Sequence, residues 1–180
     1  PESEASTECF ERRLTSILAQ RSGSSIAVLI VSLDHFKTLS DSLGHAVADQ
    51  VLELAGQRLQ SILRRSDTLS RLPDHEFAII LNPILSVLDA KATADRLTDL
   101  LQRAYLVQGH VVNTSGNIGI KLAVHTAADS ATLIKRAGMA LHCARTSGPG
   151  AVEVFETAME DRVVALHALT LDLRKALLLH

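Results

Sequence analysis

Apolar residues recur at helical spacing in several stretches of the chain. In an amphipathic helix, apolar side chains return every three or four residues and form one buried stripe. This spacing predicts helices over residues 10–18, 47–62, 90–104 and 133–144. The sequence Gly148-Pro149-Gly150 is expected to end the last of these four helices, because glycine and proline do not continue one.

Other apolar segments are short and predict strands. Residues 26–33 form an apolar run with little polar alternation, which is typical of a strand buried on both faces. Residues 118–124 alternate like a half-buried strand, and residues 152–155 predict a further short one. The two segments 68–72 and 77–81 flank a polar turn and predict a β-hairpin. Strands therefore alternate with helices, which favours the α/β class, an α+β sandwich with a mixed central sheet flanked by helices.

Composition is consistent with one folded domain and argues against nucleic-acid binding. The 180 residues are 47% hydrophobic, and 18 basic and 20 acidic residues give a net charge of −2. A chain of this length can bury a sizeable core, whereas a nucleic-acid footprint needs clustered positive charge. The apolar runs are too short to span a bilayer. Cys9 and Cys143 make no disulfide framework, so a reducing cytoplasm is expected. We expect this fragment to contact neither membrane nor nucleic acid.

Several short motifs follow one another along the chain. They are Ser32-Leu33-Asp34-His35-Phe36-Lys37, then Ser40-Asp41 with Gly44-His45 and Asp49, then Arg71-Leu72-Pro73-Asp74-His75-Glu76-Phe77, Asn117-Ile118-Gly119-Ile120, and Leu133-Ile134-Lys135-Arg136-Ala137 with Ala140-Leu141. This series resembles the GGDEF (diguanylate cyclase) family, whose motifs read D-x-D-x-F-K-x-x-N-D-x-x-G-H-x-x-G-D, R-x-G-G-D-E-F, S-I-G-I and L-L-x-R-A-D-x-A-L-Y. The resemblance covers roughly residues 8–155 and implies the GGDEF, nucleotidyl-cyclase-like fold.

The resemblance also implies that the catalytic positions are degenerate. Family members join two GTP molecules into cyclic di-GMP with metal ions bound by two carboxylates, and these carboxylates fall on Ser32 and His75. A hydroxyl carries no charge, and imidazole is a poor magnesium ligand. Pro73 and Asp74 replace the glycines that let the backbone approach a nucleotide closely. Of the two acidic letters of the motif only Glu76 is retained, and we expect no catalytic residue, no magnesium and no other metal.

A remnant of the nucleotide site is expected beside these positions. Ser40 replaces the family's guanine-binding asparagine, whereas Asp49 keeps a carboxylate that would accept from the base. Asp34 and Glu76 could lie near each other, either as alternative metal ligands or, as we favour, as hydrogen-bonding partners that hold the strand end and the hairpin. Arg145 stands where the family has a phosphate-binding lysine. The expected remnant comprises Asp34, Lys37, Ser40, Asp49 and Arg145.

A second site is implied by the sequence Arg64-Arg65-Ser66-Asp67, which reproduces the R-x-x-D of the family's inhibitory cyclic di-GMP site. Arg96 matches the additional arginine of that site on a neighbouring helix. Guanidinium groups bind phosphate and the guanine edge, and a carboxylate accepts from guanine N–H groups. Arg64, Asp67 and Arg96 are therefore candidate ligands for cyclic di-GMP. The alternative is that arginine and aspartate cap a helix end and pair with each other.

The final predicted helix, about residues 156–179, carries a heptad-like seam. Its positions step by four and three residues, which indicates either a coiled coil in a homodimer or an ordinary helix packed on its own domain. Residues 172–177 also resemble the linker helix that precedes an EAL phosphodiesterase domain. We therefore expect a degenerate GGDEF domain at 1–155 and a linker helix at 156–180 that leads toward an EAL domain. The seam consists of Met159, Val163, Leu166, Thr170, Leu173 and Leu177.

Together these observations favour a catalytically inactive GGDEF domain with a regulatory or protein-interaction role in bacterial cyclic di-GMP signalling. Its first expected partner is an EAL domain of the same chain. Three alternatives remain open: a cyclic di-GMP receptor that binds through the R-x-x-D site, a domain that binds GTP allosterically without turnover, and an active diguanylate cyclase with rearranged metal ligands.

Overall fold

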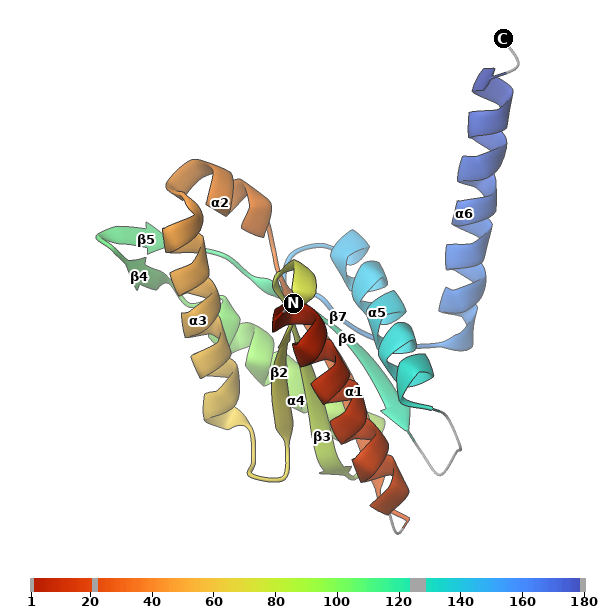
Figure 1. Cartoon of the computed structure of the whole chain (residues 1–180), viewed down its shortest axis with the longest axis horizontal. Coiled ribbons are helices and arrows are strands. Elements are labelled where there is room, and N and C mark those ends of the chain that lie inside the picture. Colours follow the sequence, from red (N-terminus) through yellow and green to blue (C-terminus); the bar gives the residue numbers. More distant parts are fainter. Residues whose placement is uncertain (1, 21–22, 124–128, 179–180) are drawn as a thin grey trace.

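The structure of the chain, a computed structural model, describes residues 2–20, 23–123 and 129–178, with the side chains of 2–5 and 157–167 left out. Its centre is a five-stranded sheet in the order β2-β3-β1-β6-β7. Strand β1 is antiparallel to both β3 and β6, whereas β7 is parallel to β6. The expected mixed sheet flanked by helices is therefore confirmed (Figure 1). The strands are β1 (Ser25–Leu33), β2 (Thr68–Leu72), β3 (Glu76–Ile84), β6 (Gly116–Ala123) and β7 (Val152–Val154).

Helices cover both faces of this sheet. On one face, α1 (Glu2–Gln20) and α5 (Ser130–Ser147) pack over Ile26, Val28 and Ile30 of β1. On the other face, α3 (His45–Ile62) and α4 (Val87–Leu101) pack over the alternate residues of the same strand. Strand β1 is thus buried on both faces, as its apolar run predicts.

Strand β6 differs from its prediction as a half-buried strand. Residues 116–120 are all buried, and only Lys121 and Leu122 are partly exposed. The cause is that α4 and α5 lie on opposite faces of this strand, so both sets of alternating side chains meet a helix. Val124 was expected in the strand and lies outside the described residues.

Two features were not predicted. A short helix, α2 (Phe36–Leu43), precedes α3 and is separated from it by Gly44, which has φ of 89°. A second small sheet pairs β4 (Tyr105–Val107) with β5 (His110–Val112) around Gln108 and Gly109, both at positive φ. The helix expected over 90–104 ends at Leu101 instead, because the chain enters this hairpin.

The side chain of Arg58 in α3 joins these elements. Its guanidinium donates to the carbonyl oxygens of Leu100 at 3.1 Å, Arg103 at 2.5 Å and Ala104 at 2.7 Å. It also lies 3.8 Å from the ring centroid of Tyr105. Carbonyl groups at a helix end lack intrahelical partners and attract positive charge. Arg58 therefore caps α4 from a different helix and fixes the start of β4.

The last helix, α6 (Thr157–Leu178), extends away from the body of the domain (Figure 1). Phe155, just before it, is buried against α5, with Lys121 Nζ at 4.9 Å and the Arg136 guanidinium at 5.5 Å from its ring centroid. Met159, Val163 and Leu166 of the predicted seam lie outside the described side chains. Leu173 and Leu177 of that seam are 59% and 79% exposed. None of the helices in the described part of the chain is long and apolar enough to cross a membrane.

Candidate functional site

The expected catalytic positions meet at one end of the central sheet. Ser32, near the end of β1, is the cross-strand partner of Glu76, the first residue of β3. The turn between β2 and β3 therefore lies beside Ser32. Arg145, in the last turn of α5, donates through Nη2 to Ser32 Oγ at 2.7 Å and to Glu76 Oε1 at 2.9 Å. A guanidinium group thus bridges the ends of two strands.

The environment of Glu76 changes its acidity. Burial raises the pKa of the Glu76 carboxyl above its ordinary value, because the charged form loses hydration. The positive charge and hydrogen bond of Arg145 oppose this shift, and the negative charge of Asp74 adds to it. Burial has the largest effect, so the pKa of Glu76 stays raised despite the ion pair.

Asp34 is directed toward a different strand. Its carboxylate accepts hydrogen bonds from the Ser115 hydroxyl and from Asn117 Nδ2, the second at 3.0 Å. Its backbone N–H donates to the Ser115 carbonyl oxygen at 2.8 Å. Asp34 therefore holds the start of β6 to the end of β1. Glu76 of the hairpin is bonded to Arg145 instead, so the two carboxylates have separate hydrogen-bonding partners, one at the strand end and one at the hairpin.

Asn117 has a structural role that the sequence did not predict. Its side chain is buried, and its Oδ1 accepts from the backbone N–H of Ala151 at 2.9 Å while its Nδ2 binds Asp34. One side chain thus joins β1 to the segment that enters β7. A lone amide inside an apolar strand was the available signal, since a buried polar group must find partners.

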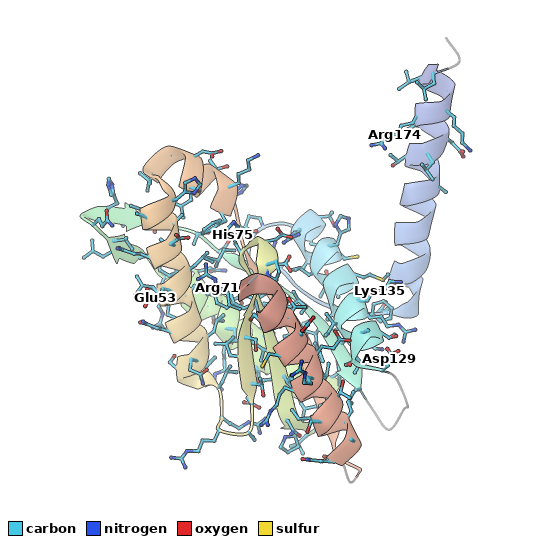
Figure 2. All side chains as sticks on the ribbon, in the orientation of Figure 1. Glu53, Arg71, His75, Asp129, Lys135 and Arg174 are labelled. Atoms are coloured by element: carbon cyan, nitrogen blue, oxygen red, sulfur yellow. The ribbon has the colours of Figure 1, made fainter. Side chains whose placement is uncertain are left out.

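The turn between β2 and β3 adopts unusual backbone angles. Asp74 and His75 have φ of 59° and 63°, values that are uncommon for any residue other than glycine, although Asn, Asp and His adopt them more often than the rest. Non-glycine residues therefore hold the left-handed conformation that glycine adopts freely. Figure 2 shows His75 at this turn, and its ring centroid lies 4.0 Å from that of Phe36. Within the described ranges, no three His, Cys, Asp or Glu side chains are grouped to hold a metal ion.

The remaining residues of the expected nucleotide remnant are not gathered into one cluster. Ser40 is buried, and its hydroxyl lies 2.7 Å from His45 Nδ1, within hydrogen-bond distance. Lys37 and Asp49 are exposed. A pocket of about 610 Å³ lies beside α2. Of the expected remnant only Asp34 lines it, together with residues such as Thr38 and Leu39. Ser32, Glu76 and Arg145 do not line this pocket.

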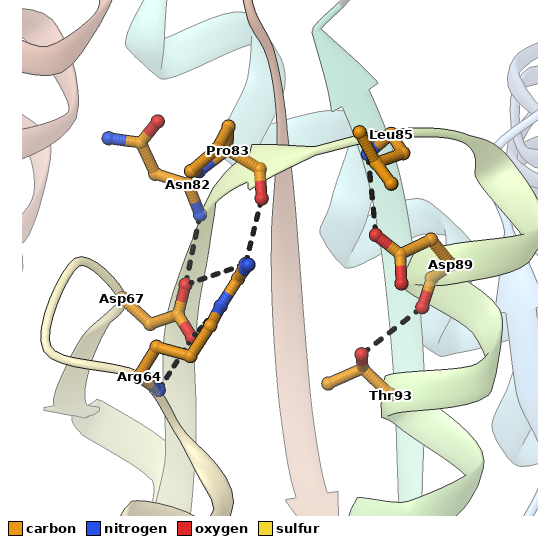
Figure 3. Close-up of polar contacts among 7 residues, drawn as sticks. All are labelled: Arg64, Asp67, Asn82, Pro83, Leu85, Asp89 and Thr93. Carbon is orange, nitrogen blue, oxygen red and sulfur yellow. Dashed lines mark hydrogen bonds and ion pairs between the residues drawn. The ribbon is translucent and has the colours of Figure 1, made fainter.

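The R-x-x-D residues form a compact unit of their own (Figure 3). The Asp67 carboxylate, whose side chain is 2% exposed, accepts from the backbone N–H groups of Arg64 at 2.8 Å and Asn82 at 3.0 Å. The Arg64 guanidinium pairs with it at 3.3 Å and donates to the Pro83 carbonyl oxygen at 2.7 Å. Arg96 is exposed on α4 and, among the described residues, makes no hydrogen bond or ion pair with either. The pairing alternative for Arg64 and Asp67 matches this geometry.

Comparison with known proteins adds independent evidence. The family described as "Diguanylate cyclase, GGDEF domain" matches residues 5–150. The diguanylate cyclase TpbB of Pseudomonas aeruginosa is 37% identical over 150 residues, which are 82% of this chain and 34% of TpbB. The cyclic di-GMP phosphodiesterase NbdA of the same organism is 29% identical over 155 residues, 86% of this chain and 20% of NbdA.

The solved structure of a truncated TpbB that comprises only its GGDEF domain superposes with a TM-score of 0.80 at 34% identity. The match covers 87% of this chain and 92% of that structure. This chain therefore spans about a third of TpbB and a fifth of NbdA, and matches nearly all of the isolated domain. The strand order, the motif spacing and these matches agree: the chain belongs to the GGDEF domain family.

Proposed function

We propose that this domain acts in bacterial cyclic di-GMP signalling as a regulatory GGDEF domain that does not synthesise the cyclic dinucleotide. The observation that carries the proposal is the state of its carboxylates at the strand ends. Asp34 is bonded to Ser115 and Asn117, and Glu76 is bonded to Arg145. Two metal ions on a triphosphate require several free hard oxygen ligands. This cluster presents a hydroxyl at Ser32 and carboxylates that already have protein partners.

The names of the relatives support a role in cyclic di-GMP signalling. TpbB is named a diguanylate cyclase. The proposed lack of cyclase activity therefore depends on this chain's own residues at Ser32, Pro73, Asp74 and His75. NbdA is named a cyclic di-GMP phosphodiesterase, and this chain matches one fifth of it. A covalently linked EAL phosphodiesterase domain, reached through α6, is therefore the proposed client of the regulation. The proposed boundary between domain and linker lies at residues 155 and 156.

Incubation with GTP tests the proposal directly. The purified domain, with GTP and magnesium or manganese, is expected to yield no cyclic di-GMP by chromatography over a range of protein concentrations. The isolated GGDEF domain of TpbB serves as the positive control, because its fold and length match this chain. Formation of cyclic di-GMP by this chain at a rate comparable with that control would contradict the proposal.

A second candidate function is that of a cyclic di-GMP receptor. The guanidinium of Arg64 is more than half exposed, and Arg96 is exposed on α4, so both cations are accessible to a phosphate. If the ligand binds there, Arg64→Ala should weaken it roughly ten- to a hundred-fold, since charge-assisted hydrogen bonds contribute about 1.5–3 kcal/mol. Calorimetric titration with cyclic di-GMP measures this loss, and Arg12→Ala on the exposed face of α1 is the control. Equal binding by wild type and Arg64→Ala would place the ligand elsewhere.

A further inference from the structure

The donor set at the strand ends does not fit a divalent cation. Magnesium and manganese prefer several oxygen ligands, among them carboxylates without another positive partner. Among the described residues, the side-chain oxygens that Arg145 contacts are those of Glu76 and Ser32. Asp34, the other carboxylate at these strand ends, is already bonded to Ser115 and Asn117. The Glu76 and Ser32 oxygens both accept hydrogen bonds from the same nitrogen of Arg145. A divalent ion at these oxygens would stand within a few ångströms of a permanent positive charge.

We infer that Arg145 is the resident cation of this site, and that its guanidinium does inside the protein what a bound metal ion would otherwise do between these strand ends. The inference rests on the proposed function and adds to it what takes the place of the metal ion. It makes the site independent of metal: the charge of Glu76 is compensated by the chain itself, and the ends of β1 and β3 are held together by a side chain of α5.

The chemistry of the guanidinium suits this role. A guanidinium remains protonated in proteins and presents several N–H donors in one plane, so it can hold a hydroxyl and a carboxylate at once. Arg145 also lies in the last turn of α5, where the helix dipole favours positive charge. The lowering effect of Arg145 on the pKa of Glu76 agrees with close compensation of charge.

The bridge also has a mechanical consequence. Helix α5 ends at Ser147, two residues after Arg145, and the chain then turns through Gly148 and Gly150 into β7. The C-terminal turn of α5 is therefore fixed to the sheet by the same bond that compensates Glu76. Without Arg145, a partly buried carboxylate would lose its partner, which is strongly unfavourable.

Calorimetric titration with MnCl2 provides the first test. Wild type and Ser32→Asp are both expected to bind Mn²⁺ weakly, because Arg145 remains and pairs with either side chain. Ser32→Asp/Arg145→Ala should bind at least about tenfold more tightly than both, since two adjacent carboxylates then lack a cation. Equal affinity in all three proteins, or tight binding by wild type, would overturn the inference.

Thermal unfolding provides a second test that needs no metal site. Arg145→Met keeps the length of the side chain and removes its charge, so its melting temperature should fall more at about pH 7 than at about pH 5, where Glu76 is more protonated. Adding Glu76→Gln to Arg145→Met should remove this pH dependence. Arg65→Met, at an exposed arginine, is the matched control and should melt like wild type. A loss in Arg145→Met that is equal at both pH values would show that Arg145 only packs.

The two tests separate this inference from the proposed function. If wild type makes no cyclic di-GMP but binds Mn²⁺ tightly, the inference about Arg145 is overturned and the proposed function is not. Wild type that synthesises cyclic di-GMP would overturn the proposed function whatever the titration shows. If the double variant Ser32→Asp/Arg145→Ala does not fold, the Arg145→Met measurements decide the inference alone.

Discussion

Glu76 links the protonation of one side chain to the stability of the whole fold. Burial raises the pKa of its carboxyl above the ordinary value of 4.5, so the folded state holds the proton more tightly than the unfolded chain does. The contribution of Glu76 to stability is therefore fully present below about pH 4.5 and decreases as the pH rises through the raised pKa. Stability therefore changes with pH in the opposite direction to that expected for a carboxylate whose pKa is lowered by an ion pair.

Glu76→Gln should remove this contribution. We expect the free energy of unfolding of wild type to fall, relative to Glu76→Gln, as the pH increases from about 4 to about 7. Urea unfolding at a series of pH values measures the difference between the two proteins. Glu53→Gln, at an exposed position of α3, is the control. Its free energy of unfolding should change with pH in the same way as that of wild type. A difference that stays constant with pH would contradict the raised pKa.

The sequence predicted which of these side chains would meet, but not how they would bond. The family resemblance placed Ser32 and His75 at one metal site, and the pairing of Ser32 with Glu76 puts the turn that carries His75 beside Ser32. The partner of each group depends on tertiary geometry. Whether Arg145 would face solvent or turn inward is decided by the position of α5, and the length of an arginine side chain permits both.

Helix α5 packs on β6 at unusually short range because of Gly119. A Cβ atom at this position would clash with backbone atoms of Ala137 and Leu141 in the helix. Backbone atoms cannot rotate away as a flexible side chain can, so the helix itself would have to move. Close packing of α5 on β6 therefore explains why the Asn117–Ile120 motif has a glycine at position 119.

Gly119→Ala should lower the free energy of unfolding by about 3 kcal/mol, at the upper end of the usual cost of overpacking. Gly138→Ala is the matched control: it lies inside α5 with nothing within 4 Å of the added methyl group, and alanine is the better helix former. That variant should gain about 0.8–1 kcal/mol. Chemical denaturation of both proteins compares them, and similar stabilities would mean that α5 is not fixed by this contact.

The helices and strands of the central sandwich were predicted well, and the small elements were not. Periodicity over a dozen residues identifies α3, α4 and α5, whereas α2 has eight residues and its pattern runs into that of α3. The β4–β5 hairpin was hidden because Tyr105 and Val107 continue the apolar spacing of α4. The signal for a turn was Gln108-Gly109 between two apolar stretches.

The molecule as a whole consists of a three-layered domain, a sheet between two layers of helices, and one helix that leaves it (Figure 1). The described leucines of α6 are exposed, and apolar surface of this kind marks contact with a partner. Leu173→Asp/Leu177→Asp should therefore reduce self-association in sedimentation experiments. The free energy of unfolding should change by no more than about 0.5 kcal/mol, as for ordinary surface substitutions, because neither side chain is in the core. The melting temperature should therefore stay close to that of wild type.

Wild type at the same concentrations is the reference for both measurements. A double variant that sediments like wild type would argue that α6 does not mediate contact between copies. A marked fall in its melting temperature would instead show that α6 packs on its own domain, and would remove the main support for a linker role.

The cap that Arg58 places on α4 has a consequence for how the domain opens. Three carbonyl groups of the α4–β4 junction depend on a side chain of α3, and so does the ring of Tyr105. Separation of α3 would therefore leave the end of α4 and the β4–β5 hairpin without their partner at the same moment. These segments should exchange their amide hydrogens with solvent as one cooperative unit, while the strands at the centre of the sheet remain protected.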